Sequence, residues 1–205
     1  RLKEAINLEL TGKESKYDDS TLWRPAIEDH EQNWCFDEPK EILTEILRDT
    51  LFEIGIKSPD KVKGILEQYL KEDYSIFRRL AIHTIRVANI DNYAEIILTD
   101  KKNLDNDKIH HEYFLLLKEK FNILNNEEQG QLLKWIKEGP DINKKIEIYK
   151  KNRNNEEPSE EIKLHWKNNW IEERLSMIEK YLSKENIEYL ENIRKQVGKS
   201  GHPEF

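Results

Sequence analysis

Apolar residues recur every three or four positions through most of the chain, which is the spacing of amphipathic helices. The pattern predicts three successive helical pairs, at residues 38–54 with 59–70, 74–89 with 93–100, and 108–124 with 127–137. Sustained alternation of apolar and polar residues is missing from the sequence, as are the Asn-Gly and Asp-Gly turns of β-hairpins. The pattern therefore predicts an all-α fold.

The spacing of these pairs is typical of a repeat architecture. The first helix of each pair begins roughly 35 residues after the previous one, as in helix–turn–helix arrays. Residues 74–89, YSIFRRLAIHTIRVAN, are typical of the first helix of a HEAT-type unit, whereas the tetratricopeptide pattern of small and aromatic positions is not met. We predict a HEAT/TPR-like right-handed array of antiparallel helical hairpins, an α-solenoid fragment best described as divergent HEAT-like.

Residues that favour turns set the expected boundaries within this single helical-repeat domain, residues 1–205. Gly55 is expected to end the first helix, Ser58-Pro59 to begin the second, and Gly139-Pro140 to end the third pair. Residues 12–37 are predicted to be irregular but packed, with the aromatic side chains of Trp23, Trp34 and Phe36 as pins. Residues 140–159 are predicted to be an insertion or loop that contains a short helix at Ile142, Ile146 and Tyr149.

A last long helix is predicted at about residues 159–182, and a shorter one at 184–197. The long helix is apolar on two separate faces, because Leu164, Ile171, Leu175, Ile178 and Leu182 share one sector and Trp166, Trp170, Met177 and Tyr181 share another. One interpretation places the helix between two neighbouring helices of the array. The alternative is that Trp166, Trp170, Met177 and Tyr181 form an exposed partner-binding surface, since Trp, Tyr and Met are enriched at binding anchors.

Candidate chemistry is sparse. His110-His111-Glu112, together with His83 and Cys35, suggests a metal site, but adjacent helical residues point about 100° apart and no HExxH or Cys-x-x-Cys pattern is present. Arg78-Arg79 is expected to place one arginine against a carboxylate of the neighbouring repeat and the other in solvent, as a weak surface pair. We predict no catalytic, cofactor-binding or metal-binding residue, and no phosphate-binding Gly-rich loop.

Composition narrows the function classes further. The 205 residues carry a formal net charge of −7, which argues against a general nucleic-acid binder. The only local basic cluster, at residues 144–153, is followed by acidic residues and is interpreted as an exposed charged loop. One cysteine and the lack of a signal peptide or a long apolar run predict a cytoplasmic location and no membrane partner. The start at Arg1 and the end at HPEF suggest a piece of a larger protein.

Four segments carry a family resemblance: WRPAIEDHEQN at residues 23–33, FRRLAIH at 77–83, HHEYFLLLKEKFNILNNEEQGQLLKWIKEGP at 110–140, and the closing GHPEF. Together they resemble the C-terminal region of very large bacterial proteins similar to STAND-type ATPases, in which a P-loop NTPase precedes a long helical-repeat region. Several such families are associated with antiphage defence, where the repeats sense a target and an N-terminal effector responds. The resemblance spans most of residues 21–205 and carries over no catalytic residue.

Two functional interpretations follow. The first is a non-catalytic scaffold or target-sensing region of a large bacterial defence-type NTPase, which contacts a protein partner or other domains of the same chain and has a tendency to self-associate. The second is a self-contained HEAT-like domain that binds or processes nucleic acid. Salt-sensitive binding to DNA is required by the second interpretation and not by the first.

Overall fold

The computed structural model describes residues 1–9, 19–31, 33 and 38–199 of the chain. Within these residues every regular element is a helix and no strand occurs, so the predicted all-α class is confirmed. The longer helices are α1 (Leu2–Glu9), α3 (Pro39–Lys57), α4 (Pro59–Leu70), α5 (Ser75–Val87), α6 (Asp91–Leu98), α7 (His110–Lys120), α8 (Asn126–Glu138), α9 (Ile142–Asn152), α10 (Glu160–Met177) and α11 (Lys184–Val197). The short ones are α2 (Ser20–Trp23) and the 3-10 turns η1 (Asn103–Asp105), η2 (Asp107–Ile109), η3 (Phe121–Ile123) and η4 (Glu179–Tyr181).

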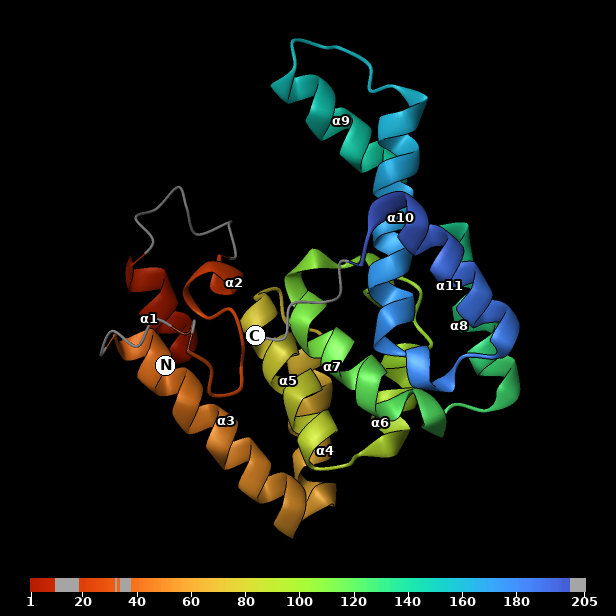
Figure 1. Ribbon diagram of the computed structural model, residues 1–205. Helices are drawn as coiled ribbons and strands as arrows, with labels where there is room; N and C mark the ends of the chain where they lie inside the picture. The colour runs from red at the N-terminus through yellow and green to blue at the C-terminus, as the bar shows by residue number, and fades with distance from the viewer. Residues whose placement is uncertain (10–18, 32, 34–37, 200–205) are drawn as a thin grey trace.

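Helices α3, α5, α7 and α10 pack against one another in that order across the molecule (Figure 1). Helix α4 packs against α3 and α5, and α6 packs against α5 and α7, as expected for the first two hairpins. The third predicted hairpin is different, because α7 packs mainly on α5, α6 and α10 while α8 packs on α10. The broad apolar face of α7 is thus covered by helices before and after it in the chain, and α8 is displaced from it.

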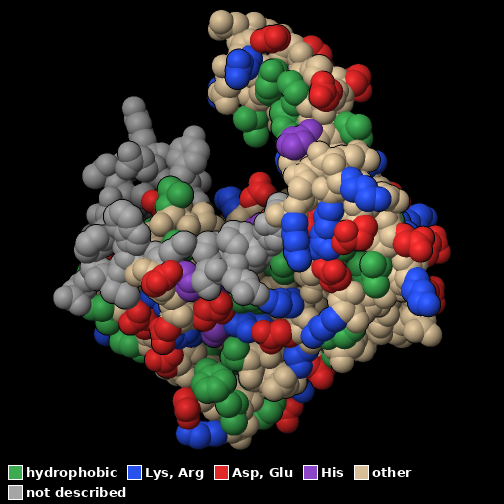
Figure 2. All heavy atoms as spheres, in the orientation of Figure 1, with side chains coloured by type: hydrophobic (Ala, Val, Ile, Leu, Met, Phe, Trp, Pro, Cys, Tyr) green, Lys and Arg blue, Asp and Glu red, His purple; other side chains and the backbone are tan. Residues whose placement is uncertain are grey.

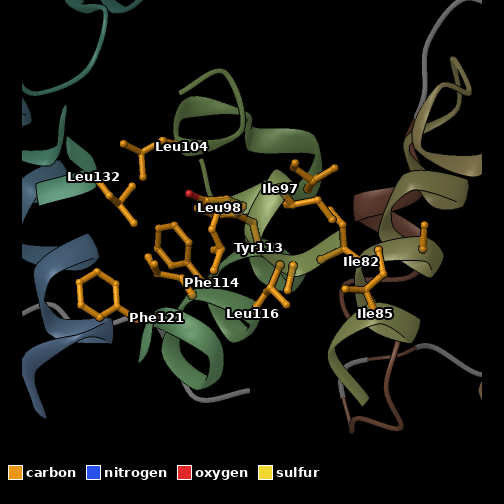
Figure 3. Packing of buried hydrophobic residues seen from close by; sticks show 14 of the residues in the cluster. Ile82, Ile85, Ile97, Leu98, Leu104, Tyr113, Phe114, Leu116, Phe121 and Leu132 are labelled. Atoms are coloured by element: carbon orange, nitrogen blue, oxygen red, sulfur yellow. The ribbon is translucent and has the colours of Figure 1, made fainter. Parts of the chain in front are cut away.

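A continuous apolar core runs through the middle of these helices (Figure 3). It passes from α5 through α6 and α7 to η3 and α8, and the labelled side chains point toward one another along this path. Representative fully buried members are Ile82, Ile85, Leu98, Tyr113, Phe114, Leu116, Phe121 and Leu132. Helix α5 is buried on nearly all sides, since most of its residues, polar ones included, are buried.

Gly55 does not end the first helix of the first pair, and that prediction is wrong. Helix α3 continues to Lys57, and Gly55 lies inside it where α5 approaches closely. A Cβ atom at this position would lie 2.9 Å from the Cβ of Ala88 and 3.6 Å from Cγ2 of Thr84. The glycine therefore serves helix–helix contact and not helix termination.

The last long helix is shorter than predicted. Helix α10 ends at Met177, and the 3-10 turn η4 follows it before α11. Its C-terminal half packs against α7, α8 and α11, whereas its N-terminal half extends away from the body beside α9 (Figure 1). The short helix expected near Ile142 is confirmed as α9, and Gly139 with a φ of 90° ends α8 as predicted.

The described part of the segment before α3 consists of α2 and an irregular stretch packed against α5. Arg24, Ala26 and Ile27 are buried there, and Trp23 is half-buried below the ammonium group of Lys40. Trp34, Cys35 and Phe36 lie outside the described residues, as does the closing GHPEF segment. None of the described helices is both long enough and apolar enough to cross a membrane.

Candidate functional site

The predicted partner-binding surface on α10 is only partly accessible. Trp170 is 5% exposed, and its indole Nε1 donates a hydrogen bond to Asp105 Oδ1 at 3.0 Å. The guanidinium carbon of Arg174 lies 3.8 Å from the centre of a Trp170 ring. Trp170 is therefore a structural residue that joins α10 to η1, and its assignment to an exposed surface is corrected.

The other three residues of that prediction are half-buried and lie apart. Trp166 packs edge-on against Tyr149 of α9, with ring centres 5.6 Å apart. Met177 and Tyr181 pack against the apolar core at the other end of α10, and the Tyr181 ring lies 5.5 Å from that of Phe121. At 1.5 Å of rise per residue, Trp166 and Met177 are on the order of 16 Å apart along the helix axis, so the residues do not form one continuous surface.

Trp166 belongs to a projecting region that we call the arm, residues 142–166, formed by α9 and the first turns of α10 (Figure 1). Helix α9 has no buried residue, and Ile148 and Leu164 are 61% and 53% exposed. Figure 2 shows hydrophobic side chains gathered on this part of the molecule. Leu164 and Trp166 also line a hollow of about 480 Å³ that Val197 of α11 closes on its other side. The arm thus presents apolar surface that no described residue covers.

The most concentrated polar chemistry lies elsewhere, between the segment before α3 and helices α5 and α7. Arg79 of α5 and Glu112 of α7 form a bidentate ion pair, with Nε to Oε2 at 2.8 Å and Nη2 to Oε1 at 2.9 Å. Both side chains are 1% exposed. Arg79 also donates to the carbonyl oxygens of Ser20 and Pro25, and Glu112 Oε1 accepts from the backbone N–H of Ile27. All these bonds hold one segment on two helices.

Glu28 is the second centre of this cluster. Its Oε2 accepts from Arg86 Nη2 at 2.6 Å, and its Oε1 lies 3.1 Å from Nε2 of His111. His83 Nδ1 lies 3.8 Å from Oε2 of the same carboxylate and forms no hydrogen bond, although it is buried. One carboxylate from the segment is therefore surrounded by three basic side chains from α5 and α7.

Arginines from outside α5 complete the cluster. Arg24 turns back on its own segment, donates to the carbonyls of Ala26 and Ile27, and pairs with Glu45 of α3 at 2.9 Å. Arg48 of α3 donates to the carbonyl of Ile27. We call these residues the polar clamp: Arg24, Glu28, Arg48, Arg79, His83, Arg86, His111 and Glu112.

The electrostatics of the polar clamp follow from burial and pairing. Burial opposes ionisation of Glu28, but the hydrogen bond with His111 and the charge of Arg86 outweigh it and lower the pKa of this carboxyl group. Burial and the neighbouring charge of Arg86 lower the pKa of His83 to about 4, so this imidazole is neutral at pH 7. Glu112 is fully desolvated, yet Arg79 lowers the pKa of its carboxyl group. The carboxylates are therefore charged and the His83 ring is neutral.

This arrangement is suited to holding a chain segment. The carboxylates of Glu28 and Glu112 are occupied by cations and backbone donors of the same cluster, and the neutral His83 ring is a weak base because its pKa is low. The adjoining hollow of about 270 Å³ is lined by Glu28, Asp29 and Arg48 among others. Over the described ranges, no group of three or more His, Cys, Asp or Glu residues is arranged to hold a metal ion.

The sequence predicted part of this cluster. One arginine of Arg78-Arg79 does pair with a carboxylate of the next helical pair, but the pair is buried, so its assignment to the surface is wrong. His110 and His111 diverge as the helical geometry requires. The His110 ring packs against that of Phe114, with ring centres 4.0 Å apart and a tilt of 50°, while His111 faces Glu28. Glu28 and Glu112 were not predicted as partners. The sequence did contain a signal for Glu112, because this charged residue lies beside the apolar residues of the helix predicted at 108–124.

Comparison of this chain with known protein families, with curated proteins and with solved structures yields no match.

Proposed function

We propose that this chain is a non-catalytic helical-repeat module, a HEAT-like array that recognises a protein partner or a neighbouring domain through the arm. The observation that supports it best is the uncovered apolar surface of α9 and the start of α10, with Ile148, Leu164 and Trp166 at its centre. Single apolar residues are normal on protein surfaces, but several apolar residues on one projecting element favour an interaction site. Aromatic residues such as Trp166 are frequent anchors at such sites.

The polar clamp supports a structural role for the rest of the module. Its ionised groups hold the segment before α3 against α5 and α7, so they are already engaged within the module and are not offered to a partner. The body is thereby held in one arrangement, from which the arm projects.

The resemblance to STAND-type ATPase proteins extends this proposal to a larger setting. There the module is a target-sensing or scaffold segment of a bacterial defence-type NTPase. A target that binds one arrangement of the full protein better than another shifts the equilibrium between them by its differential affinity.

The proposal is tested by affinity capture from bacterial lysates, with and without phage infection, followed by mass spectrometry. The bait is the chain itself, and the arm variant is Leu164→Asn/Trp166→Ala. The matched control is Leu22→Asn, because Leu22 is an exposed leucine on α2, away from the arm. A specific partner is expected to be retained by the control and lost with the arm variant. Retention by all three baits contradicts the arm as the recognition surface.

A second measurement distinguishes the protein-recognition module from the alternative, a domain that binds nucleic acid. Titration of the chain with duplex DNA at 50 and 200 mM salt is expected to give no salt-sensitive binding, in keeping with the net charge of −7. Figure 2 supports this expectation, since acidic and basic side chains are interspersed over the visible face. Tight binding that weakens steeply with salt favours the alternative.

A further inference from the structure

A hollow of about 420 Å³ lies on the side of α5 that carries Arg78. Its walls come from the end of α4, from α5 and α6, and from the segment that contains η1 and η2. The volume lies within the range of small-molecule sites, which are usually apolar with a few placed polar groups. Its lining includes the charged residues Arg78, Asp100 and Lys102 and the apolar residues Ile82, Ile96 and Ile97.

Arg78 is the half-buried cation of this hollow, and no described residue pairs with its side chain. It forms no hydrogen bond or ion pair with a described residue, and its Nε is buried without an acceptor. Its neighbour Arg79, by contrast, uses its whole guanidinium group within the polar clamp. A guanidinium offers five donors in a planar fork that matches a carboxylate, and a half-buried one without an acceptor is unusual.

The remaining walls divide into an apolar and a polar part. Ile82 and Ile97 are buried and form apolar wall, while Ile96 is 63% exposed at the surface. Lys102 is exposed and its ammonium group has no described partner, and Asp100 accepts a hydrogen bond from the backbone N–H of Lys102. Two cations and one carboxylate leave a net charge of +1 along the walls.

We propose that this hollow, the Arg78 hollow, binds a monoanionic ligand with a branched aliphatic body, whose carboxylate pairs with Arg78. The isoleucine side chains of the walls contact the aliphatic body, and the guanidinium group of Arg78 donates hydrogen bonds to the carboxylate. The single net positive charge matches one carboxylate better than a dianionic phosphate. A carboxylate joined to a branched aliphatic chain occurs in a free branched-chain acid and at the C-terminal leucine of a peptide.

The experiment is a titration of the ¹⁵N-labelled chain, followed by amide chemical shifts, with four probes. These are 4-methylpentanoate, its primary amide, the peptide acetyl-Gly-Gly-Leu with a free C-terminus, and the same peptide amidated. Shifts are expected at residues that line the Arg78 hollow with at least one of the two carboxylates. The amide forms are expected to bind at least about tenfold more weakly, because hydrogen bonds between charged groups are the stronger ones.

Three variants test the site. Arg78→Met keeps the aliphatic stem and is expected to weaken carboxylate binding at least about tenfold. Ile96→Glu places a negative charge at an exposed position and is expected to weaken it similarly without affecting folding. Arg153→Met is the matched control, because Arg153 is an exposed arginine at the end of α9, does not line the hollow, and has no carboxylate partner among the described residues.

The outcomes separate the two sources of the ligand. Tighter binding of the free-acid peptide than of 4-methylpentanoate assigns the hollow to a protein C-terminus, and the reverse order assigns it to a small acid. The proposal is overturned if amides and carboxylates bind equally, if Arg78→Met binds as the unmodified chain does, or if neither carboxylate shifts the hollow residues. Because the arm takes no part in these measurements, their failure leaves the proposed recognition function standing.

Discussion

At the scale of single residues, the Arg79–Glu112 pair is the clearest example of charge used to position a chain segment. Two desolvated ions gain from each other, and the remaining donors of Arg79 and an oxygen of Glu112 bind backbone groups of residues 20–27. Exchanging such a pair for apolar residues is often tolerated, whereas removing one partner leaves an uncompensated charge in the interior.

We therefore expect Arg79→Met to lower the free energy of unfolding by roughly 3–5 kcal/mol. Arg79→Met/Glu112→Met is expected to cost less than the sum of its two single changes. Arg153→Met, on an exposed arginine, is expected to stay within about 0.5 kcal/mol of the unmodified chain. Urea unfolding followed by circular dichroism measures all four variants. Additive losses in the double variant would contradict coupling between the two side chains.

The polar clamp also makes stability dependent on pH. The unfolded chain binds a proton at His83 near the ordinary pKa of 6.5, whereas the folded chain binds it only near pH 4. The free energy of unfolding is thus expected to fall by on the order of 3 kcal/mol as the pH drops through this window. Glu28, whose pKa is lowered below 4.5, adds a further loss below that pH.

His83→Gln is the variant for this prediction, because a neutral side chain removes the proton that only the unfolded chain binds. Its stability is expected to depend less on pH between 6.5 and 4 than that of the unmodified chain. His165→Gln, at an exposed position on α10, is the control and is expected to keep the original slope. Thermal unfolding at several pH values provides the measurement, and parallel curves for the two histidine variants would refute the role of His83.

Only part of the polar clamp could be predicted from the sequence, for a physical reason. The pairing of one arginine with the next helical unit follows from helix spacing, because 33 residues separate Arg79 and Glu112. The burial of that pair depends on Ile27, which lies 85 positions before Glu112 and comes from an irregular segment. Local periodicity carries no information about where such a segment packs.

At the scale of helices, periodicity predicted the existence and order of the main elements, but packing decided several of their ends. Glycine is a common helix terminator, yet α3 continues past Gly55 to Lys57. The glycine is there because α5 lies too close for a side chain. Helix α10 is interrupted after Met177 by a 3-10 turn. The first difference involves residues distant in sequence, since Thr84 and Ala88 lie against Gly55.

The close approach at Gly55 leads to a paired prediction. Gly55→Ala improves helix propensity, but its Cβ would lie 2.9 Å from that of Ala88, so we expect a net loss of about 1–3 kcal/mol. Gly64→Ala in α4 has open space around its Cβ and is expected to gain about 0.5–1 kcal/mol. Equilibrium unfolding of the two variants compares one substitution in two settings. A gain at both positions would show that α3 and α5 separate easily.

At the scale of the whole molecule, burial is distributed unevenly. Helix α5 is enclosed by α3, α4, α6 and α7, whereas α9 has no buried residue and rests beside the projecting half of α10. Local opening requires less free energy where few apolar contacts must be broken. The fold therefore combines a stable centre with a much less stable arm.

Native-state hydrogen exchange is expected to reproduce this gradient. Amides of α5 and α7 should exchange most slowly, and those of α9 about a hundredfold or more faster. The comparison is made by mass spectrometry at two protein concentrations, because a second copy that covers the arm would slow exchange only at the higher one. Equal protection of α9 and α5 at the lower concentration would contradict the gradient.

The polar clamp has a consequence for the order of events during synthesis. Residues 20–28 leave the ribosome before the helices that hold them, since their partners lie as far ahead as Glu112. Closing so long a loop is entropically costly until α5 and α7 have docked, so the early segment should be among the last parts to reach its native place. Arg24 and Ile27, which are buried in the folded chain, are therefore expected to leave solvent late.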